Sequence, residues 1–211
     1  MATKGRRKSA KVAVPAEADQ ILDATLALAE ERGWDNVRLR LVANRLEIPL
    51  SEVLKHYRDL DAVADAWFGR AWTAMLAPTP EGFAELPARE RLHLMLMRWF
   101  DALADHKDVT GQMLSTKLYL SHPHHWVPMI FNLSRTIQWL RDAAMLDAGG
   151  LRRQVEEVGL TSLFLATLAY WLRDESLAQE RTRDFLASGL GIADEALARF
   201  PSKFRQGLGE A

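Results

Sequence analysis

Hydrophobic residues recur at helical spacing along most of the chain. The first amphipathic stretch places its apolar face at Ile21, Leu22, Thr25, Leu28 and Ala29. Gly33 marks the end of this helix. Two shorter stretches with the same periodicity predict helices of about two turns, over residues 38–46 and 50–57. Asp59 then supplies an N-cap for a longer helix that reaches Leu76.

The part of the chain after residue 87 also has helical periodicity, and no alternating β-branched runs predict strands there. We expect helices over residues 88–104, 109–120, 124–146, 151–172 and 177–188, and a last one over 193–200. Proline and glycine residues separate these stretches, and Gly189 and Gly191 divide the last two. The pattern therefore predicts an all-α fold.

A segment with three prolines, residues 78–87, divides the chain into two helical parts and is expected to be a linker. Helices of two turns are unstable by themselves, so two in succession need a tertiary partner, which a helix-turn-helix unit supplies. We therefore expect a three-helix helix-turn-helix DNA-binding domain over residues 16–77. A larger helical domain is expected over residues 88–200, followed by a tail over 201–211.

Charge is unevenly placed along the chain, although the net charge is only −1. Residues 1–58 carry 11 Lys and Arg against 8 Asp and Glu. Residues 1–15, which we expect to form a disordered arm, hold the basic residues Lys4, Arg6, Arg7, Lys8 and Lys11. Such an arm can neutralise DNA phosphates, or it can be a solvated tail, and composition alone leaves both open.

The residues needed for redox, metal and catalytic chemistry are scarce. There is no cysteine, which excludes disulfides and thiolate sites. His122, His124 and His125 cluster at a spacing that matches no zinc motif, so we expect no metal site. The sequence has no nucleophile elbow and no phosphate-binding loop, and we expect neither catalysis nor a cofactor. The lack of a signal sequence or a long apolar run predicts a soluble, cytoplasmic protein.

Residues 17–68 contain several features in a characteristic order. They are the helix ILDATLALAEERGW, Val42-Ala43 in the second helix, Ile48 in the turn, Tyr57, and Asp59 and Asp61 at the start of the next helix. In order and spacing this segment resembles the DNA-binding module of TetR-family transcriptional regulators. The resemblance implies that residues 49–57 form the recognition helix.

The resemblance also implies which side chains face DNA. These are Arg38, Ser51, Glu52, Lys55, His56 and Arg58. Three other residues depart from the family pattern: Glu47 replaces a small turn residue, Leu54 a phosphate-contacting tyrosine, and Leu60 a lysine. A module that keeps the fold without binding DNA well is therefore the alternative, because a fold does not fix a function.

The same resemblance implies that the second domain is a ligand chamber whose last two long helices pair with a second subunit. The side chains expected at the dimer interface are Leu160, Leu163, Phe164, Leu168, Trp171 and Phe185. Those expected to line an apolar pocket are Trp99, Met113, Leu118, Tyr119, Trp126, Ile130, Phe131 and Trp139. The alternative is that such residues only fill a core. The expected function is a homodimeric regulator, a repressor, that binds operator DNA and an apolar small-molecule effector.

A second resemblance covers residues 165–190. The aromatic Tyr170-Trp171, the break at Asp174-Glu175-Ser176 and the following Phe185-Leu186 are similar to TetR-like lipid-binding accessory proteins of ubiquinone biosynthesis. This resemblance implies an alternative function, in which the same fold binds an isoprenoid or acyl lipid rather than DNA.

Overall fold

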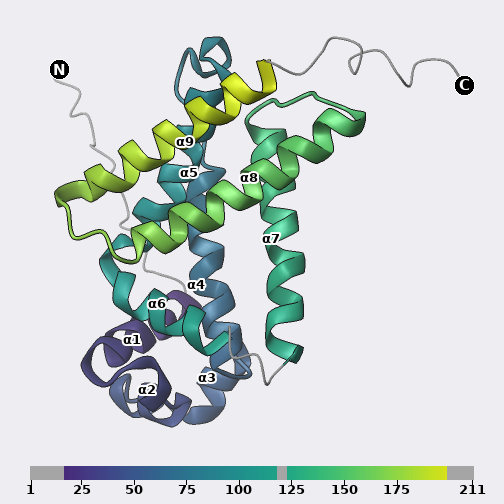
Figure 1. The fold of residues 1–211 in the computed structure, drawn as a ribbon. Coiled ribbons are helices and arrows are strands. Elements are labelled where there is room, and N and C mark those ends of the chain that lie inside the picture. Colours follow the sequence, from purple (N-terminus) through teal and green to yellow (C-terminus); the bar gives the residue numbers. More distant parts are fainter. Residues whose placement is uncertain (1–16, 118–122, 199–211) are drawn as a thin grey trace, which may run out of the picture.

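The computed structural model of the protein describes residues 17–117 and 123–198, with side chains for residues 17–116 and 133–198. Every regular element in these ranges is a helix, which confirms the all-α fold (Figure 1). The α-helices are α1 (Glu17–Arg32), α2 (Leu39–Arg45), α3 (Leu50–His56), α4 (Leu60–Met75), α5 (Ala88–Leu103), α6 (Lys107–Lys117), α7 (Pro123–Ala143), α8 (Gly150–Trp171) and α9 (Glu180–Ala198). Short 3-10 turns precede or join several of them: η1 (Trp34–Asn36), η2 (Phe83–Glu85), η3 (Ala104–His106) and η4 (Leu177–Gln179).

The short helices α2 and α3 pack against each other and against the longer α1 at the lower end of the molecule (Figure 1). Each short helix buries its apolar face, with Val42 and Val53 completely inaccessible to solvent. Ile21 of α1 and Val63 of α4 are buried in the same core. The two-turn helices are therefore stabilised by tertiary packing rather than by their own length.

The turn between α2 and α3 is closed by two backbone hydrogen bonds. The N–H of Ile48 donates to the carbonyl of Ala43, and the N–H of Glu47 donates to that of Asn44. This is the Schellman pattern of a helix C-terminus, which needs a left-handed residue after the cap. Glu47 takes that conformation with φ of 55°, where glycine is usually favoured.

Helix α4 begins as expected at Asp59, whose carboxylate accepts a hydrogen bond from the N–H of Ala62 at 2.8 Å. It packs along α5, where aromatic rings join the core across several helices. The ring of Trp99 on α5 meets that of Phe164 on α8 edge-on at 5.0 Å, and Phe100 lies 5.6 Å from Trp171. These large rings fix α8 over α5 through close packing.

The expected linker, residues 78–87, is tied to α5. It contains η2, whose Phe83 is buried. The guanidinium of Arg98 donates to the carbonyl of Ala77 at 2.9 Å, and that of Arg91 donates to the carbonyl of Leu86 at 2.8 Å. The segment thus runs over the surface of the helices, and its buried Phe83 packs into the core.

One expected helix boundary is wrong. The predicted division at Gly189 and Gly191 does not occur, because α9 continues as one helix to Ala198. A Cβ atom at Gly189 would lie 2.4 Å from Cδ1 of Leu163 on α8. The glycine therefore permits the close packing of α9 on α8, visible where the two helices run side by side in Figure 1.

Among the described residues, no helix has the length and hydropathy needed to cross a membrane.

Candidate functional site

Helix α3 exposes the predicted DNA-facing residues on the outer side of the module. Ser51 and Lys55 are exposed and Glu52 is half-buried, while Val53 faces the core. The Lys55 ammonium donates to both carboxylate oxygens of Glu52 at 2.7 Å. Such an exposed pair is weak, so Lys55 can exchange this partner for a phosphate at little cost.

The other predicted DNA-facing residues lie at the ends of the short helices. Arg38 caps α2 and donates to the backbone carbonyls of Asp35 and Val37. His56 lies 3.5 Å from the carboxylate of Glu17, and Arg58 pairs with Asp59 at 3.1 Å. Arg58 is the most exposed of these cations, with 83% of its side chain accessible.

The three departures from the family pattern occupy different environments. Glu47 is exposed in its left-handed turn. Leu54 projects from α3 with 46% of its surface accessible, next to an equally exposed Leu50 at 41%. Leu60 is half-buried and packs against the core of the module. The exposed face of α3 is therefore more apolar than its charges suggest.

Ion pairs join α4 to α1 within the module. Arg70 on α4 contacts Asp23 at 2.5 Å and Asp19 at 3.0 Å, both on α1. Burial lowers the pKa of Arg70, but its hydrogen bonds with Asp23 and Asp19 outweigh this effect and raise the pKa overall. Tyr57 donates from its hydroxyl to the carbonyl of Ala18 at 3.1 Å, and burial raises the pKa of that phenol. The Arg70 pairs thus fix α4 to α1, and the Tyr57 hydrogen bond ties the end of α3 to α1.

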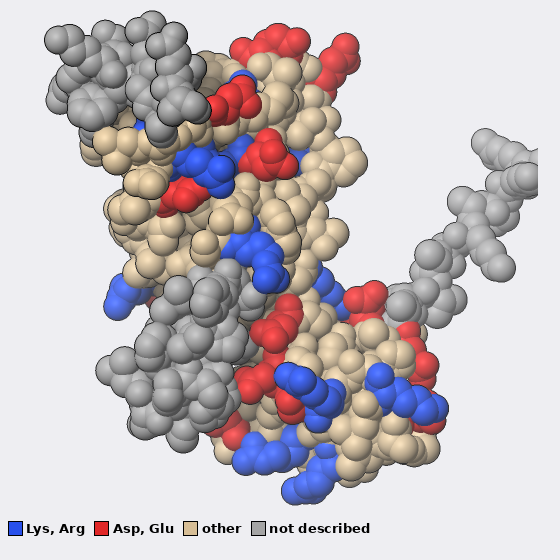
Figure 2. Space-filling view, turned by 90° about the vertical axis from the view of Figure 1, so that its right-hand side faces the viewer, with Lys and Arg blue, Asp and Glu red and all other residues tan. Residues whose placement is uncertain are grey.

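Lys and Arg side chains gather over the lower end of the molecule in Figure 2, where the helix-turn-helix helices lie, with acidic side chains beside them. This surface carries basic groups on α2, α3 and the α3–α4 turn. Exposed basic groups around a short helix of this kind are suited to a nucleic-acid groove.

The residues predicted to line a pocket have different positions. Trp99 and Met113 are buried, whereas Trp139 is 38% exposed and meets the ring of Trp72 edge-on at 5.8 Å. The buried Nε1 of Trp99 has no hydrogen-bond partner in the described part of the chain. The other five residues predicted to line the pocket lie outside the residues whose side chains are described: Leu118, Tyr119, Trp126, Ile130 and Phe131.

The residues predicted at a dimer interface do not share one surface. Leu160, Phe164 and Trp171 are buried in the core of the protomer, with at most 7% exposed. Leu163, Leu168 and Phe185 are half-buried. The spacing of apolar residues along α8 did not reveal which face turns inwards, because both faces are apolar. The outer face carries Val158, Leu165 and Tyr170, and the ring of Tyr170 stacks on that of Phe185 at 4.7 Å.

A search of the solved structures decides the family. A TetR transcriptional regulator from Nitrosomonas europaea is 40% identical, with a TM-score of 0.76 over 84% of this chain and 98% of that one. The chain belongs to the TetR family of transcriptional regulators. A TetR regulator from Rhodococcus sp. RHA1 shares the fold at 15% identity, with a TM-score of 0.53 over 82% and 93% of the chains. No model of a protein family matches the chain, and no curated protein does.

In this TetR-family protein, α6 lies against the helix-turn-helix module. The side-chain carbonyl of Gln112 accepts from the N–H of Trp34 at 2.6 Å, and His106 lies 2.6 Å from the carboxylate of Glu30. A third link joins Thr116 to Asp35 at 3.1 Å. Local sequence patterns could not indicate these contacts, because their partners are about 80 residues apart.

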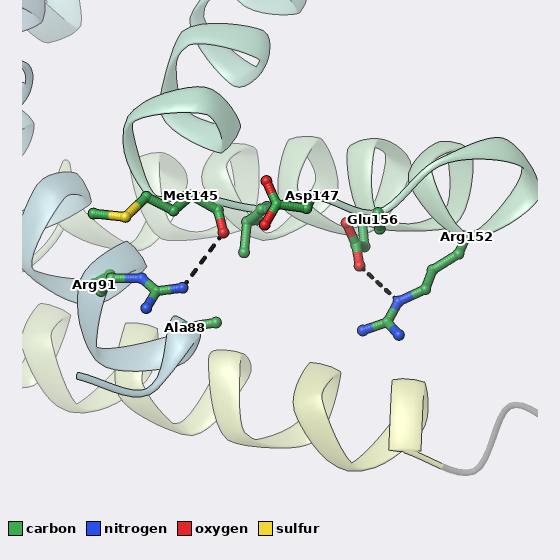
Figure 3. Close-up of a pocket in the computed structure, with 8 residues that line it drawn as sticks. Ala88, Arg91, Met145, Asp147, Arg152 and Glu156 are labelled. Carbon is green, nitrogen blue, oxygen red and sulfur yellow. Dashed lines mark hydrogen bonds and ion pairs between the residues drawn. The ribbon is translucent and has the colours of Figure 1, made fainter. Parts of the chain in front are cut away.

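The sequence analysis also missed a charged cluster between α7 and α8. The Arg141 guanidinium contacts Glu156 at 3.0 Å and Glu157 at 3.3 Å, with only 6% of the Arg141 side chain exposed. Beside it lies a hollow of about 390 Å³. Figure 3 shows two arginines at this hollow, each already engaged: Arg91 by the backbone of Met145, and Arg152 by Glu156.

No group of acidic and histidine residues among the described residues is arranged to hold a metal ion. His122 lies outside the described residues, as do the side chains of His124 and His125.

Proposed function

We propose that this TetR-family protein is a homodimeric transcriptional repressor in the cytoplasm that binds a palindromic operator through α3 of each subunit. The observation that carries the proposal is the position of α3. It lies on a surface with exposed basic side chains, and it is held from behind by the buried Val53 and by the hydrogen bond of Tyr57 to Ala18 of α1. A pre-organised helix with phosphate-binding cations around it is what major-groove docking requires.

An exposed face of α8 supports the dimer. Small and apolar residues alternate there, with Ala166 and Ala169 next to Leu165 and Tyr170. Small side chains allow two helices to approach closely, and a two-fold interface uses the same patch on both subunits. Ala166→Arg is expected to give a folded monomer in sedimentation analysis. Thr73→Arg on the exposed side of α4 is the matched control, and it should remain dimeric.

A ligand in the C-terminal domain would have to change the spacing of the two α3 helices. The links from η3 and α6 to α1 and η1 support such coupling, because a shift of η3 and α6 together would move His106 and Gln112 with it. The unpartnered Trp99 Nε1 supports an apolar effector that has one hydrogen-bond acceptor. Regulation requires that the effector bind the two conformations with different affinity.

Selection of genomic DNA fragments on the purified protein, followed by sequencing, tests the proposal. We expect one enriched palindrome, bound with an affinity that falls steeply with salt. Lys55→Ala should weaken binding to all sequences. It should also reduce the slope of log affinity against log salt concentration by about one, because one phosphate contact is lost. Deletion of residues 1–12 tests the contribution of the basic arm in the same assay.

The second candidate function, lipid binding without DNA recognition, is favoured by the locally paired charges on α3 and its exposed leucines. Mass spectrometry of the purified protein distinguishes the two. A co-purifying isoprenoid or acyl lipid, together with no enriched DNA sequence, would replace the repressor proposal by this one.

A further inference from the structure

Two leucines form an exposed ridge on α3. Leu50 and Leu54 are 41% and 46% accessible, and they lie one helical turn apart on the same face. Neither contributes to the buried core, which α3 reaches through Val53. The ridge therefore occupies the surface of the short helix that projects from the module.

The charged groups on α3 are already paired. Glu52 accepts both of its contacts from Lys55, and His56 lies beside Glu17. Glu52 also repels phosphate when Lys55 leaves it. Together with the small exposed Ser51, the apolar ridge is consequently the part of α3 that can meet a partner without first breaking an ion pair.

Charge complementarity identifies that partner as duplex DNA. Around the ridge the chain carries four exposed cations and two acidic residues: Arg38 and Arg40 at the start of α2, Lys55 on α3 and Arg58 after it, against Glu47 and Glu52. Duplex DNA offers phosphates to such cations, and in its major groove the thymine C5 methyl is the apolar group that base pairs present. An apolar ridge between basic residues matches both features of that groove.

We infer that Leu50 and Leu54 contact thymine methyl groups, so that each operator half-site carries thymine opposite this ridge. The inference rests on the proposed DNA-binding function and adds the chemical basis of its sequence preference. Direct readout by this protein is then mainly apolar, whereas its cations position the helix on the backbone without selecting a sequence.

The experiment replaces thymine by deoxyuridine, which removes only the C5 methyl. Synthetic duplexes of the selected operator carry this change at one symmetric pair of positions at a time, and the full-length dimer is titrated against each. Loss of one buried methyl contact per half-site corresponds to about a fourfold weaker binding, or roughly 15-fold for the pair. At least one pair of positions should show this loss, and positions outside the ridge should show none.

Leu54→Ala provides the protein side of the test. It should weaken binding to the thymine duplex and leave little further effect of deoxyuridine at the position that Leu54 contacts. Leu76→Ala is the matched control, since Leu76 is 42% exposed at the far end of α4. Its binding and its sensitivity to deoxyuridine should be those of the unchanged protein, and circular dichroism confirms that both variants fold.

Each remaining outcome is decisive. If an operator is bound but every deoxyuridine duplex binds as tightly as the thymine duplex, the inference is overturned and the proposed function stands. If no sequence is enriched in the selection, the proposed function fails, and the inference fails with it. If vesicles of anionic and neutral phospholipid retain the protein through Leu54 while deoxyuridine has no effect, the ridge is a membrane contact and the inference is wrong.

Discussion

The same residue types form ion pairs at the two ends of the molecule, in opposite environments. On the helix-turn-helix module, Lys55 pairs with Glu52 and Arg45 with Glu31, and the two basic side chains are 63% and 39% exposed. Between α7 and α8, Arg141 and Glu156 pair at 6% and 8% exposure. Water and salt weaken the first kind of pair, whereas neither partner of the second can be removed without leaving a buried charge.

The difference has a functional meaning. In the proposed function, the exposed pair of Lys55 with Glu52 holds this cation of α3 in place until a phosphate replaces the carboxylate, which costs little. The buried pair of Arg141 with Glu156 fixes α7 to α8 and defines their relative position. The charges of the helix-turn-helix module are therefore free to exchange partners, whereas those between α7 and α8 are not.

The largest effect is expected for Glu156→Ala. This change leaves the Arg141 guanidinium buried without its closest partner, and it should lower the free energy of unfolding by about 3–5 kcal/mol. Urea denaturation of the purified protein measures this loss. A loss below about 1 kcal/mol would mean that water or Glu157 compensates for the missing carboxylate, and the contrast between the two ends would not hold.

Asp174→Asn tests a second buried charge, which follows the C-terminal end of α8. Oδ2 of Asp174 accepts from the N–H and hydroxyl of Thr182 at 2.9 and 2.6 Å, and Oδ1 accepts from the N–H of Ser176 at 2.9 Å. Burial raises the pKa of Asp174, but these hydrogen bonds outweigh it and hold the pKa well below its usual range. We expect the substitution to lower the unfolding free energy by about 2 kcal/mol at neutral pH.

The lowered pKa of Asp174 also sets the pH dependence. The folded pKa lies below the unfolded value of about 4, so the carboxylate stabilises the fold above that pH and loses its contribution as the pH falls below it. The difference between the wild type and Asp174→Asn should therefore shrink in acid. Denaturation curves at neutral pH and at about pH 3 measure this change, and a constant difference would contradict it.

Glu47→Gly is expected to stabilise the module by about 1 kcal/mol. Glycine adopts a φ of 55° without the steric penalty that a side chain brings, and Glu47 makes no contact that the change would remove from the core. Thermal unfolding measures the gain. Asn44→Gly, three residues earlier in α2, is the control and should destabilise the protein by a similar amount, because it lies in regular helix.

Glu52→Ala should change the stability least, by at most about 0.5 kcal/mol, because its pair with Lys55 is exposed. It should nevertheless strengthen DNA binding at low salt, since Lys55 then reaches a phosphate without first leaving Glu52, while the slope of affinity against salt concentration stays the same because the same cation is engaged. Fluorescence anisotropy over a range of salt concentrations tests both expectations. Binding no tighter than that of the unchanged protein would show that Lys55 does not contact the backbone.

Much of the fold followed from local pattern. The periodicity predicted α1 to α8 with ends within about four residues, and the N-cap at Asp59 was correct because it depends on neighbouring residues only. The division of α9 at Gly189 was wrong. The sequence alone does not show whether a glycine ends a helix or allows a second helix to pack closely against it. At Gly189 the contact with Leu163 of α8 shows that the second role applies.

The site residues were less accessible to prediction. The resemblance located α3 and its exposed side chains, but it identified Leu54 only as the residue that replaces a tyrosine of the family. Only the three-dimensional structure shows that Leu54 is exposed next to Leu50 and that Lys55 pairs with Glu52. Along α8, apolar residues on both sides left open which of them face a partner.

The sequence by itself determined that the protein is helical, where most helices begin and end, and which segment forms the helix-turn-helix module. These properties depend on interactions within a few residues of each other, through periodicity, caps and breakers. The tertiary structure decided which face of α8 is outermost, that Arg141 meets Glu156, and that α6 contacts η1. Those outcomes depend on burial and on partners distant in the chain. The free-energy contribution of a charge or a leucine depends on its surroundings in the folded protein, and the residue type alone does not determine it.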